Sequence, residues 1–397
     1  MGRCDRSGRQ ERPGPAPENG GTVDTHERDA RGLLAELVEL DTVGGGEGAA
    51  ASLAARVLEL SGLRVRTVGW EPGREQLLAT TPEPADSPPL TFTGHLDTVP
   101  ATAADWSSDP WRAEIDGDRM VGRGTSDMKS GVAAFLVALR QHRARPHRCR
   151  GAQVVLTAGE ETGAEGAAGL PTGLARTGGW LIVGEPTANR LVPAHKGALW
   201  LRLTAQGVPA HGSAPESGRN AVVTLARVAT ALHDRADWPA QDGFGAVTAN
   251  VGRMSGGTQV NVVPDAAELH LDLRTVPEVG AEALRERVRA IAGPEIEVSD
   301  LVNLPPVSTP PDAAVVTAAR EALRGAGLEE RPAPPARFFT DASVLAERLD
   351  AAGTVILGPG EPEQCHVVDE WCSLTRLSEA VDLYDRLLDS WCSAPVR

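Results

Sequence analysis

A histidine and an aspartate two residues apart, His95 and Asp97, follow an apolar β-type run that ends at Gly94. Side chains at i and i+2 project to the same side of extended backbone, so the imidazole and the carboxylate can contact each other. A carboxylate beside an imidazole fixes the ring tautomer and raises its basicity, as is usual behind a metal-ligating histidine. Alone, the pair more often marks an ordinary histidine at a strand end, so a metal site requires further ligands.

Acidic residues follow two other apolar runs at the same kind of position. Residues 152–157 precede the adjacent pair Glu160 and Glu161, and residues 180–183 precede Glu185. Neighbouring carboxylates repel each other, so these two are either solvated in a loop or held by a cation. Ligands of α/β sheets bind at the carboxyl ends of the strands. Three runs therefore deliver a histidine and several carboxylates toward one edge of a predicted sheet.

Asp127 and His366 occupy two further unusual places. Asp127 lies on a glycine-rich approach to a helix expected from Met128 to about His142, and an N-cap is its alternative role. This approach matches neither the P-loop nor the dinucleotide fingerprint. His366 follows an apolar run at 354–357 and a turn rich in Gly and Pro. Imidazoles and carboxylates together suit a pair of divalent ions such as zinc, which about 3.5–4 Å apart form a known hydrolytic device.

The elements that must position these side chains alternate between helix and strand. Amphipathic patterns predict two helices between His26 and Gly62, broken at glycines 44–46, and a last helix from Leu374 to Leu388. Strands are expected at 63–70, 76–80, 90–94, 152–157, 180–183 and 354–357. This order predicts an α/β catalytic domain with a mixed sheet flanked by helices.

The middle of the chain has a different pattern. Strands are expected there at 198–205, 246–251 and 266–273, and helices at 220–233 and 281–291. We therefore expect an α+β domain at 189–300, inserted between two segments of the catalytic domain, 26–188 and 301–397. Residues 1–25 are rich in Gly, Pro, Arg and Glu and are expected to be a disordered tail.

The composition limits the classes of function. A chain of 397 residues with 41% hydrophobic content is long enough for two domains with cores. The net charge of −15 argues against nucleic acid and anionic membranes as partners. No run resembles a secretory signal or a membrane span. Five cysteines without paired spacing indicate reduced thiols, and we expect a cytoplasmic protein.

Five segments, in order, resemble the metallopeptidase family that includes acetylornithine deacetylase, succinyl-diaminopimelate desuccinylase, aminoacylase and glutamate carboxypeptidase (the M20 family). The segments are Gly94-His-Leu-Asp-Thr-Val-Pro, Gly122-Arg-Gly-Thr-Ser-Asp-Met-Lys-Ser-Gly, Gly159-Glu-Glu-Thr-Gly, Gly184-Glu-Pro-Thr and Cys365-His366. Any one of them would be unspecific, but five in family order are highly specific. The resemblance implies a di-zinc aminopeptidase-like catalytic domain with an inserted lid and dimerisation domain.

The resemblance also implies a role for each ligand. Asp127 would bridge two divalent metal ions, His95 and Glu185 would complete one site, and Glu161 and His366 would complete the other. The ions would be zinc, with cobalt or manganese as alternatives.

Glu160 would be the general base of the implied reaction. A metal-bridging hydroxide would attack the acyl carbon of an amide, and Glu160 would pass the proton to the leaving amine. Asp97 would support His95. The substrate would be a small N-acyl amino acid or a related N-acyl amine, as for an acetylornithine deacetylase-like deacylase. The alternatives are a di-metal dipeptidase or carboxypeptidase, and a non-catalytic relative that only binds an N-acyl amino acid.

The resemblance places further candidate residues in the lid and near it. His211 would enter the active site of the partner subunit of a homodimer and stabilise the oxyanion, unless it is an ordinary loop histidine. Arg274 and Asn261 fall where relatives bind the substrate's carboxylate, although a structural salt bridge is an equal alternative for Arg274. Lys196 and Thr340 lie in segments where further substrate contacts are expected.

Overall fold

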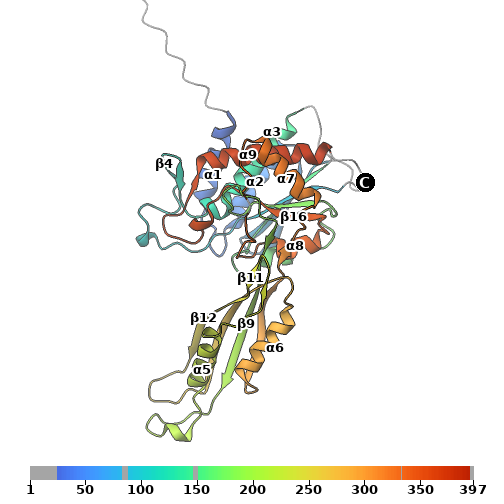
Figure 1. The fold of residues 1–397 in the computed structure, drawn as a ribbon. Helices are drawn as coiled ribbons and strands as arrows, with labels where there is room; N and C mark the ends of the chain where they lie inside the picture. The colour runs from blue at the N-terminus through green and yellow to red at the C-terminus, as the bar shows by residue number, and fades with distance from the viewer. Residues whose placement is uncertain (1–24, 83–87, 146–150, 332, 394–397) are drawn as a thin grey trace, which may run out of the picture.

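The computed structural model describes residues 25–82, 88–145, 151–331 and 333–393. A disordered tail was expected at residues 1–25, and residues 1–24 of it lie outside the part of the chain that the structure describes. Figure 1 shows a broad α/β body from which a narrower arm of sheet and helices projects. Within the described residues, no helix combines the length and the apolar character that crossing a membrane requires.

A six-stranded mixed sheet forms the centre of the body. Its order is β1-β2-β6-β3-β7-β16, and the last four strands run parallel, whereas β1 and β2 pair antiparallel. The strands are β1 (Arg64–Glu71), β2 (Arg74–Thr80), β3 (Leu90–His95), β6 (Ala152–Thr157), β7 (Trp180–Val183) and β16 (Gly353–Ile356). Every residue of β3, β6 and β7 is buried, which explains their continuous apolar runs.

Helices cover both faces of this sheet, because alternate strand residues point to opposite sides. On one face, the rings of Phe92 in β3 and Phe135 in α3 stack at 4.1 Å, and Tyr384 of α9 packs edge-on against both. This layer contains α1 (Thr25–Val38), α2 (Glu47–Leu60), α3 (Ser130–Arg143), α7 (Ala314–Gly325) and α9 (Leu374–Ser393). The other face holds α4 (Glu165–Gly169) and α8 (Ala342–Arg348).

The projecting arm, which we call the lid, is an antiparallel sheet with the order β12-β13-β9-β14. Its strands are β9 (Gly197–Gln206), β12 (Thr248–Gly256), β13 (Ala266–Thr275) and β14 (Ile296–Leu304). Two helices, α5 (Ala221–His233) and α6 (Ala281–Ala292), pack on it and share a separate apolar core. Asn220 caps α5 by accepting a hydrogen bond from the Val223 N–H at 3.0 Å.

Several elements differ from the sequence-based expectation. The sequence analysis did not identify β14, which completes the lid sheet and continues four residues beyond residue 300. Likewise, residues near 192 pair with the body rather than with the lid, since Val192 bridges Ile356. The remaining strands form three small sheets. Two are pairs: β8 (Ala194–His195) with β15 (Val307–Ser308), and β10 (Ala240–Gln241) with β11 (Gly245–Ala246). The third has the order β17 (Trp371–Ser373), β5 (Arg119–Val121) and β4 (Glu114–Asp116).

Candidate active site

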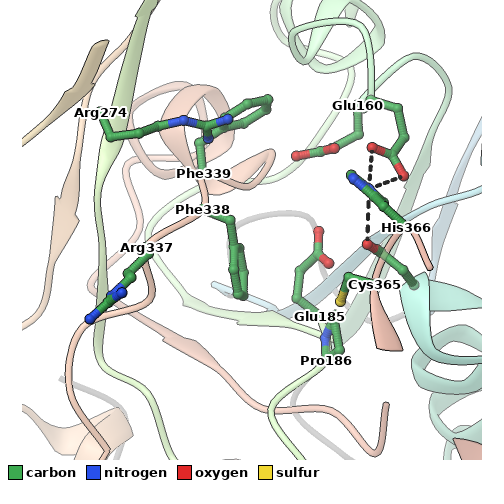
Figure 2. A pocket seen from close by; sticks show the side chains of 11 residues that line it. Glu160, Glu185, Pro186, Arg274, Arg337, Phe338, Phe339, Cys365 and His366 are labelled. Carbon is green, nitrogen blue, oxygen red and sulfur yellow. Dashed lines mark hydrogen bonds and ion pairs between the residues drawn. The ribbon is translucent and has the colours of Figure 1, made fainter. Parts of the chain in front are cut away.

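The carboxyl ends of three parallel strands bring the acidic residues and His95 together. His95 is the last residue of β3, Glu160 and Glu161 follow β6, and Glu185 follows β7. Because β3 lies between β6 and β7, these side chains meet at one edge of the sheet. Figure 2 shows Glu160, Glu185 and His366 around a common space.

Asp127 lies between the two histidines. Its Oδ1 is 3.1 Å from Nε2 of His95, and its Oδ2 is 3.4 Å from Nε2 of His366. The His95 nitrogen is also 3.7 Å from Oε1 of Glu185, and the His366 nitrogen is 3.0 Å from Oε2 of Glu161. One carboxylate thus faces two clusters, each with its own histidine and its own glutamate.

This donor set fits divalent cations. Ligand atoms of His95, Asp127 and Glu161 lie within 4.8 Å of one another, as do those of His95, Glu160 and Glu185. Four carboxylates converge on one cavity, and bound cations would offset the repulsion between them. Imidazole nitrogens and carboxylate oxygens are ligands that zinc and related ions accept.

The electrostatics of the protein alone reflect this crowding. Burial raises the pKa of Glu160 well above its ordinary value, and the neighbouring charge of Glu185 raises it further. Burial also raises the pKa of Glu185 well above the ordinary range. For His95, burial opposes the charged form, but the carboxylates of Glu185 and Asp127 outweigh it and raise the pKa. Burial is thus the main cause of the raised pKa of the two glutamates, whereas neighbouring negative charge is the cause of the raised pKa of His95.

Asp97 lies beside His95, as expected, and makes further contacts as well. The ring Nδ1 of His95 bonds the backbone oxygen of Asp97 at 2.9 Å, whereas the Asp97 carboxylate is 3.6 Å away. That carboxylate accepts the backbone N–H groups of Glu160 at 3.2 Å and Glu161 at 3.1 Å. Asp97 therefore fixes the turn that presents both glutamates.

Glu370 is a residue that the sequence analysis missed. This fully buried carboxylate accepts the backbone N–H groups of Ser126 at 2.8 Å and Asp127 at 2.9 Å on Oε1. Its Oε2 accepts the N–H of Gly124 at 2.9 Å and the guanidinium of Arg123 at 2.7 Å. Glu370 thereby joins the loop of Asp127 to the segment that carries His366. Its only signal in the sequence is an acidic residue four positions after that histidine.

Asp127 is not a helix N-cap. Helix α3 begins at Ser130, two residues later than expected, and Asp127 has extended backbone angles, with φ −114° and ψ 92°. The Glu370 carboxylate accepts backbone N–H groups of this loop and so holds its conformation. The Asp127 side chain therefore points to the histidines rather than back to the helix.

Three of the candidate substrate residues are already occupied within the chain. Arg274 lines the cavity, but its Nε and Nη2 both lie 3.1 Å from Oδ2 of Asp272. The Lys196 ammonium donates to the backbone oxygen of Ala246. Thr340 is buried, and its hydroxyl is 3.1 Å from Nε2 of His195.

His211 and Asn261 lie together, but apart from the other candidates. Both are exposed, and the Asn261 carbonyl accepts the N–H of Gly212 at 2.7 Å. Neither residue lines the cavity that contains Glu160. The single chain therefore does not bring these two lid residues to the cluster of carboxylates.

Comparisons with known proteins agree with this fold. A sequence model described as peptidase family M20/M25/M40 matches residues 91–390. The acetylornithine deacetylase of Pasteurella multocida (strain Pm70) is 29% identical over 356 residues, which cover 86% of this chain and 90% of that protein. A probable succinyl-diaminopimelate desuccinylase of Staphylococcus aureus (strain MRSA252) is 26% identical over 387 residues, covering 89% and 95%.

A solved structure shows the same fold. The Bacillus subtilis YXEP protein, described as a dinuclear metal-binding peptidase of the M20 family, superposes with a TM-score of 0.67 at 16% identity, covering 91% of this chain and 97% of that one. The α/β architecture and the family resemblance predicted from the sequence are confirmed. This chain belongs to the peptidase family M20/M25/M40 and is an enzyme of this metal-dependent family of peptidases and deacylases.

Proposed function

We propose that the protein hydrolyses the amide bond of a small N-acyl amino acid or related N-acyl amine. The observation that carries this proposal is the position of Glu160, whose carboxylate lies beside donor atoms of His95 and Glu185 on a cavity of about 410 Å³. A cavity of this size suits a small molecule. Arg274 lines the same cavity, and although Asp272 binds its Nε and Nη2, its Nη1 has no hydrogen bond within the described residues and is proposed to meet a substrate carboxylate.

Five side chains are proposed to hold two divalent ions. His95 and Glu185 would ligate one ion, Glu161 and His366 the other, and Asp127 would ligate both. Bound ions of this kind polarise an acyl oxygen and acidify water. Zinc is the proposed metal, and cobalt and manganese accept the same donors.

Glu160 is proposed to move the proton. It takes a proton from the attacking water and delivers it to the nitrogen of the leaving amine, which must be protonated to depart. Asp97 positions Glu160 through the backbone N–H that it accepts. Glu160 is only 6% exposed, so it makes little contact with bulk water.

The lid is proposed to complete the site through a homodimer. Strand β12 is an edge strand of the lid sheet, and most of its residues are exposed. Exposed edges are templates for pairing with another chain. Met254 of β12 and Val223 of the adjacent α5 are exposed apolar side chains near this edge. A second copy paired here would bring its His211 and Asn261 toward the substrate.

We also propose a cytoplasmic location. Cys365, Cys372 and Cys392 are free thiols among the described residues. Reduced cysteines are typical of that compartment.

A dipeptidase or carboxypeptidase activity is the second candidate, since the family is one of peptidases. A dipeptide differs from an N-acyl amino acid by a free ammonium on the acyl side. The carboxylates that line the cavity are those of Asp127, Glu160, Glu161 and Glu185, all of which the proposal already uses. The N-acyl substrate is therefore the better match. The intact Glu160 and complete ligand set argue against a non-catalytic relative.

The experiment that tests this function measures amine release from N-acetyl, N-succinyl and N-formyl amino acids and from dipeptides. The metal-reconstituted protein is compared with Glu160→Gln, and the metal content of both is determined. Cleavage of an N-acyl substrate by the wild type alone, with equal metal content, supports the proposal. Cleavage of dipeptides only would favour the second candidate, and a metal-loaded wild type that cleaves nothing would refute both.

A further inference from the structure

The cavity has two chemically different walls. One wall carries the four carboxylates assigned above to metal binding and proton transfer. The other carries two arginines and two aromatic rings: Arg274, Arg337, Phe338 and Phe339. Figure 2 shows Arg274, Phe338 and Phe339 opposite Glu160, Glu185 and His366, with Arg337 on the far side of Phe338 from Glu185.

The second wall is cationic, and Arg337 is its uncompensated member. Arg274 is paired with Asp272, whereas Arg337 is exposed and has no ion pair or hydrogen bond within the described residues. Lys196 lies close enough to Arg337 that the arginine's charge adds to burial in lowering the pKa of the lysine. The ammonium of a basic substrate side chain that entered this side of the cavity would therefore meet the like charge of Arg337.

Phe338 provides the apolar surface of this wall. Phe339 is buried, packs edge-on against Trp200 at 6.0 Å and lies under the guanidinium of Arg274 at 5.2 Å. Phe338 is only half-buried and has no aromatic partner in the described part of the chain. Its ring stands between Arg337 on one side and Glu185 and Cys365 on the other (Figure 2).

The backbone holds this wall in place. The N–H of Ala336 donates to the oxygen of Ala194, and the oxygen of Ala336 accepts the N–H of Lys196, both at 2.9 Å. Arg337 and Phe338 follow directly, so their positions are set by pairing between two segments rather than by a free loop.

We propose that this cavity selects N-acyl amino acids with an uncharged, apolar side chain that packs on Phe338, and rejects basic side chains. The inference rests on the proposed function. An ammonium at the end of the side chain would lose its hydration without gaining a free carboxylate, and Arg337 would repel it. The selectivity is thus opposite to that named for the relative called acetylornithine deacetylase.

The first test uses a matched pair of substrates. N-acetyl-L-norleucine and N-acetyl-L-ornithine have side chains of equal length that end in a methyl group and an ammonium, respectively. We expect kcat/KM of the wild type to favour norleucine by roughly 10-fold or more, because the ammonium of ornithine would give up part of its hydration near the like charge of Arg337 without gaining a free carboxylate. A preference for ornithine overturns the inference alone. If the metal-loaded protein cleaves neither compound nor any other N-acyl amino acid, both the proposed function and this inference are refuted.

The second test locates the selectivity in two side chains. The norleucine-to-ornithine ratio of kcat/KM should decrease from wild type to Arg337→Gln and again to Arg337→Glu. Arg331→Glu, an exposed arginine six positions earlier that pairs with Glu329, is the matched control and should leave the ratio unchanged. Phe338→Ala should lower kcat/KM for norleucine roughly 10-fold more than for N-acetylglycine, because only the longer side chain uses the ring. An unchanged ratio in both Arg337 variants, or equal losses on both substrates in Phe338→Ala, would overturn the assignment.

Discussion

The body and the lid contribute to the proposed active site in different ways. In the body, His95 and Glu185 are nearly fully buried, and hydrogen bonds that the carboxylates of Asp97 and Glu370 accept hold the loops around them. In the lid, His211 and Asn261 are exposed and do not line the cavity. The comparison teaches that the proposed metal ligands are preorganised within one chain, whereas the proposed oxyanion contact would come from His211 of a second chain. Metal binding and turnover should therefore respond differently to changes in the two regions.

The largest expected effect is in the body, at Glu160. Glu160→Gln keeps the shape of the side chain and removes the proton acceptor, so kcat should fall by roughly 10²- to 10⁴-fold. Metal content should stay at the wild-type level, because the proposal does not make Glu160 a ligand. Steady-state kinetics and elemental analysis of the same sample check both statements. A variant with near-normal kcat would remove Glu160 from its role.

The next largest effect is in the lid, at His211. His211→Ala should lower kcat by roughly 10²- to 10³-fold, as for the loss of one oxyanion donor, without loss of metal. Mixing this variant with Glu160→Gln shows whether His211 acts in the site of its own chain or in that of the partner. If His211 acts in the partner's site, a mixed dimer contains one site with both residues intact, and activity returns. No recovery in verified mixed dimers would show that the histidine does not act across the interface.

A smaller effect is expected at Glu370, on metal binding. Glu370→Gln replaces one accepting carboxylate oxygen with a donating NH₂ group, so at least one backbone N–H in the loop of Asp127 loses its acceptor. Residues that orient metal ligands typically contribute about 10- to 100-fold to metal affinity. Competition with a chelator should show this loss, whereas the exposed Glu363→Gln on the same segment should match the wild type. Equal affinities would mean that Glu370 does not position the ligand.

The smallest effect is expected at the edge of the lid. Met254→Lys places a charge on an exposed apolar position of β12. If this edge forms the dimer, the dissociation constant should rise by about 10-fold, the value of losing a partly buried apolar side chain. Analytical ultracentrifugation over a range of concentrations measures this shift. A wild type that is monomeric at every concentration would contradict the interface itself.

The difference between the two regions also explains which residues the sequence could reveal. His95, Glu161 and Glu185 follow buried parallel strands, and strand ends converge by topology alone, so their meeting was predictable. Glu370 could not be found in this way, because its partners at 123–127 are distant in sequence and are backbone groups. The hydrogen bonds of the Lys196 and Thr340 side chains could not be predicted either, because each depends on a tertiary contact.

The measurement that tests the central claim most directly is the number of metal ions bound per chain. The account predicts two divalent ions per wild-type chain after reconstitution and dialysis, and a loss of bound metal in Asp127→Ala, because that carboxylate faces both clusters. Elemental analysis of folded protein, with folding checked by circular dichroism, gives the number. A wild type that binds no metal, or an Asp127→Ala variant that keeps both ions, would contradict the proposed centre.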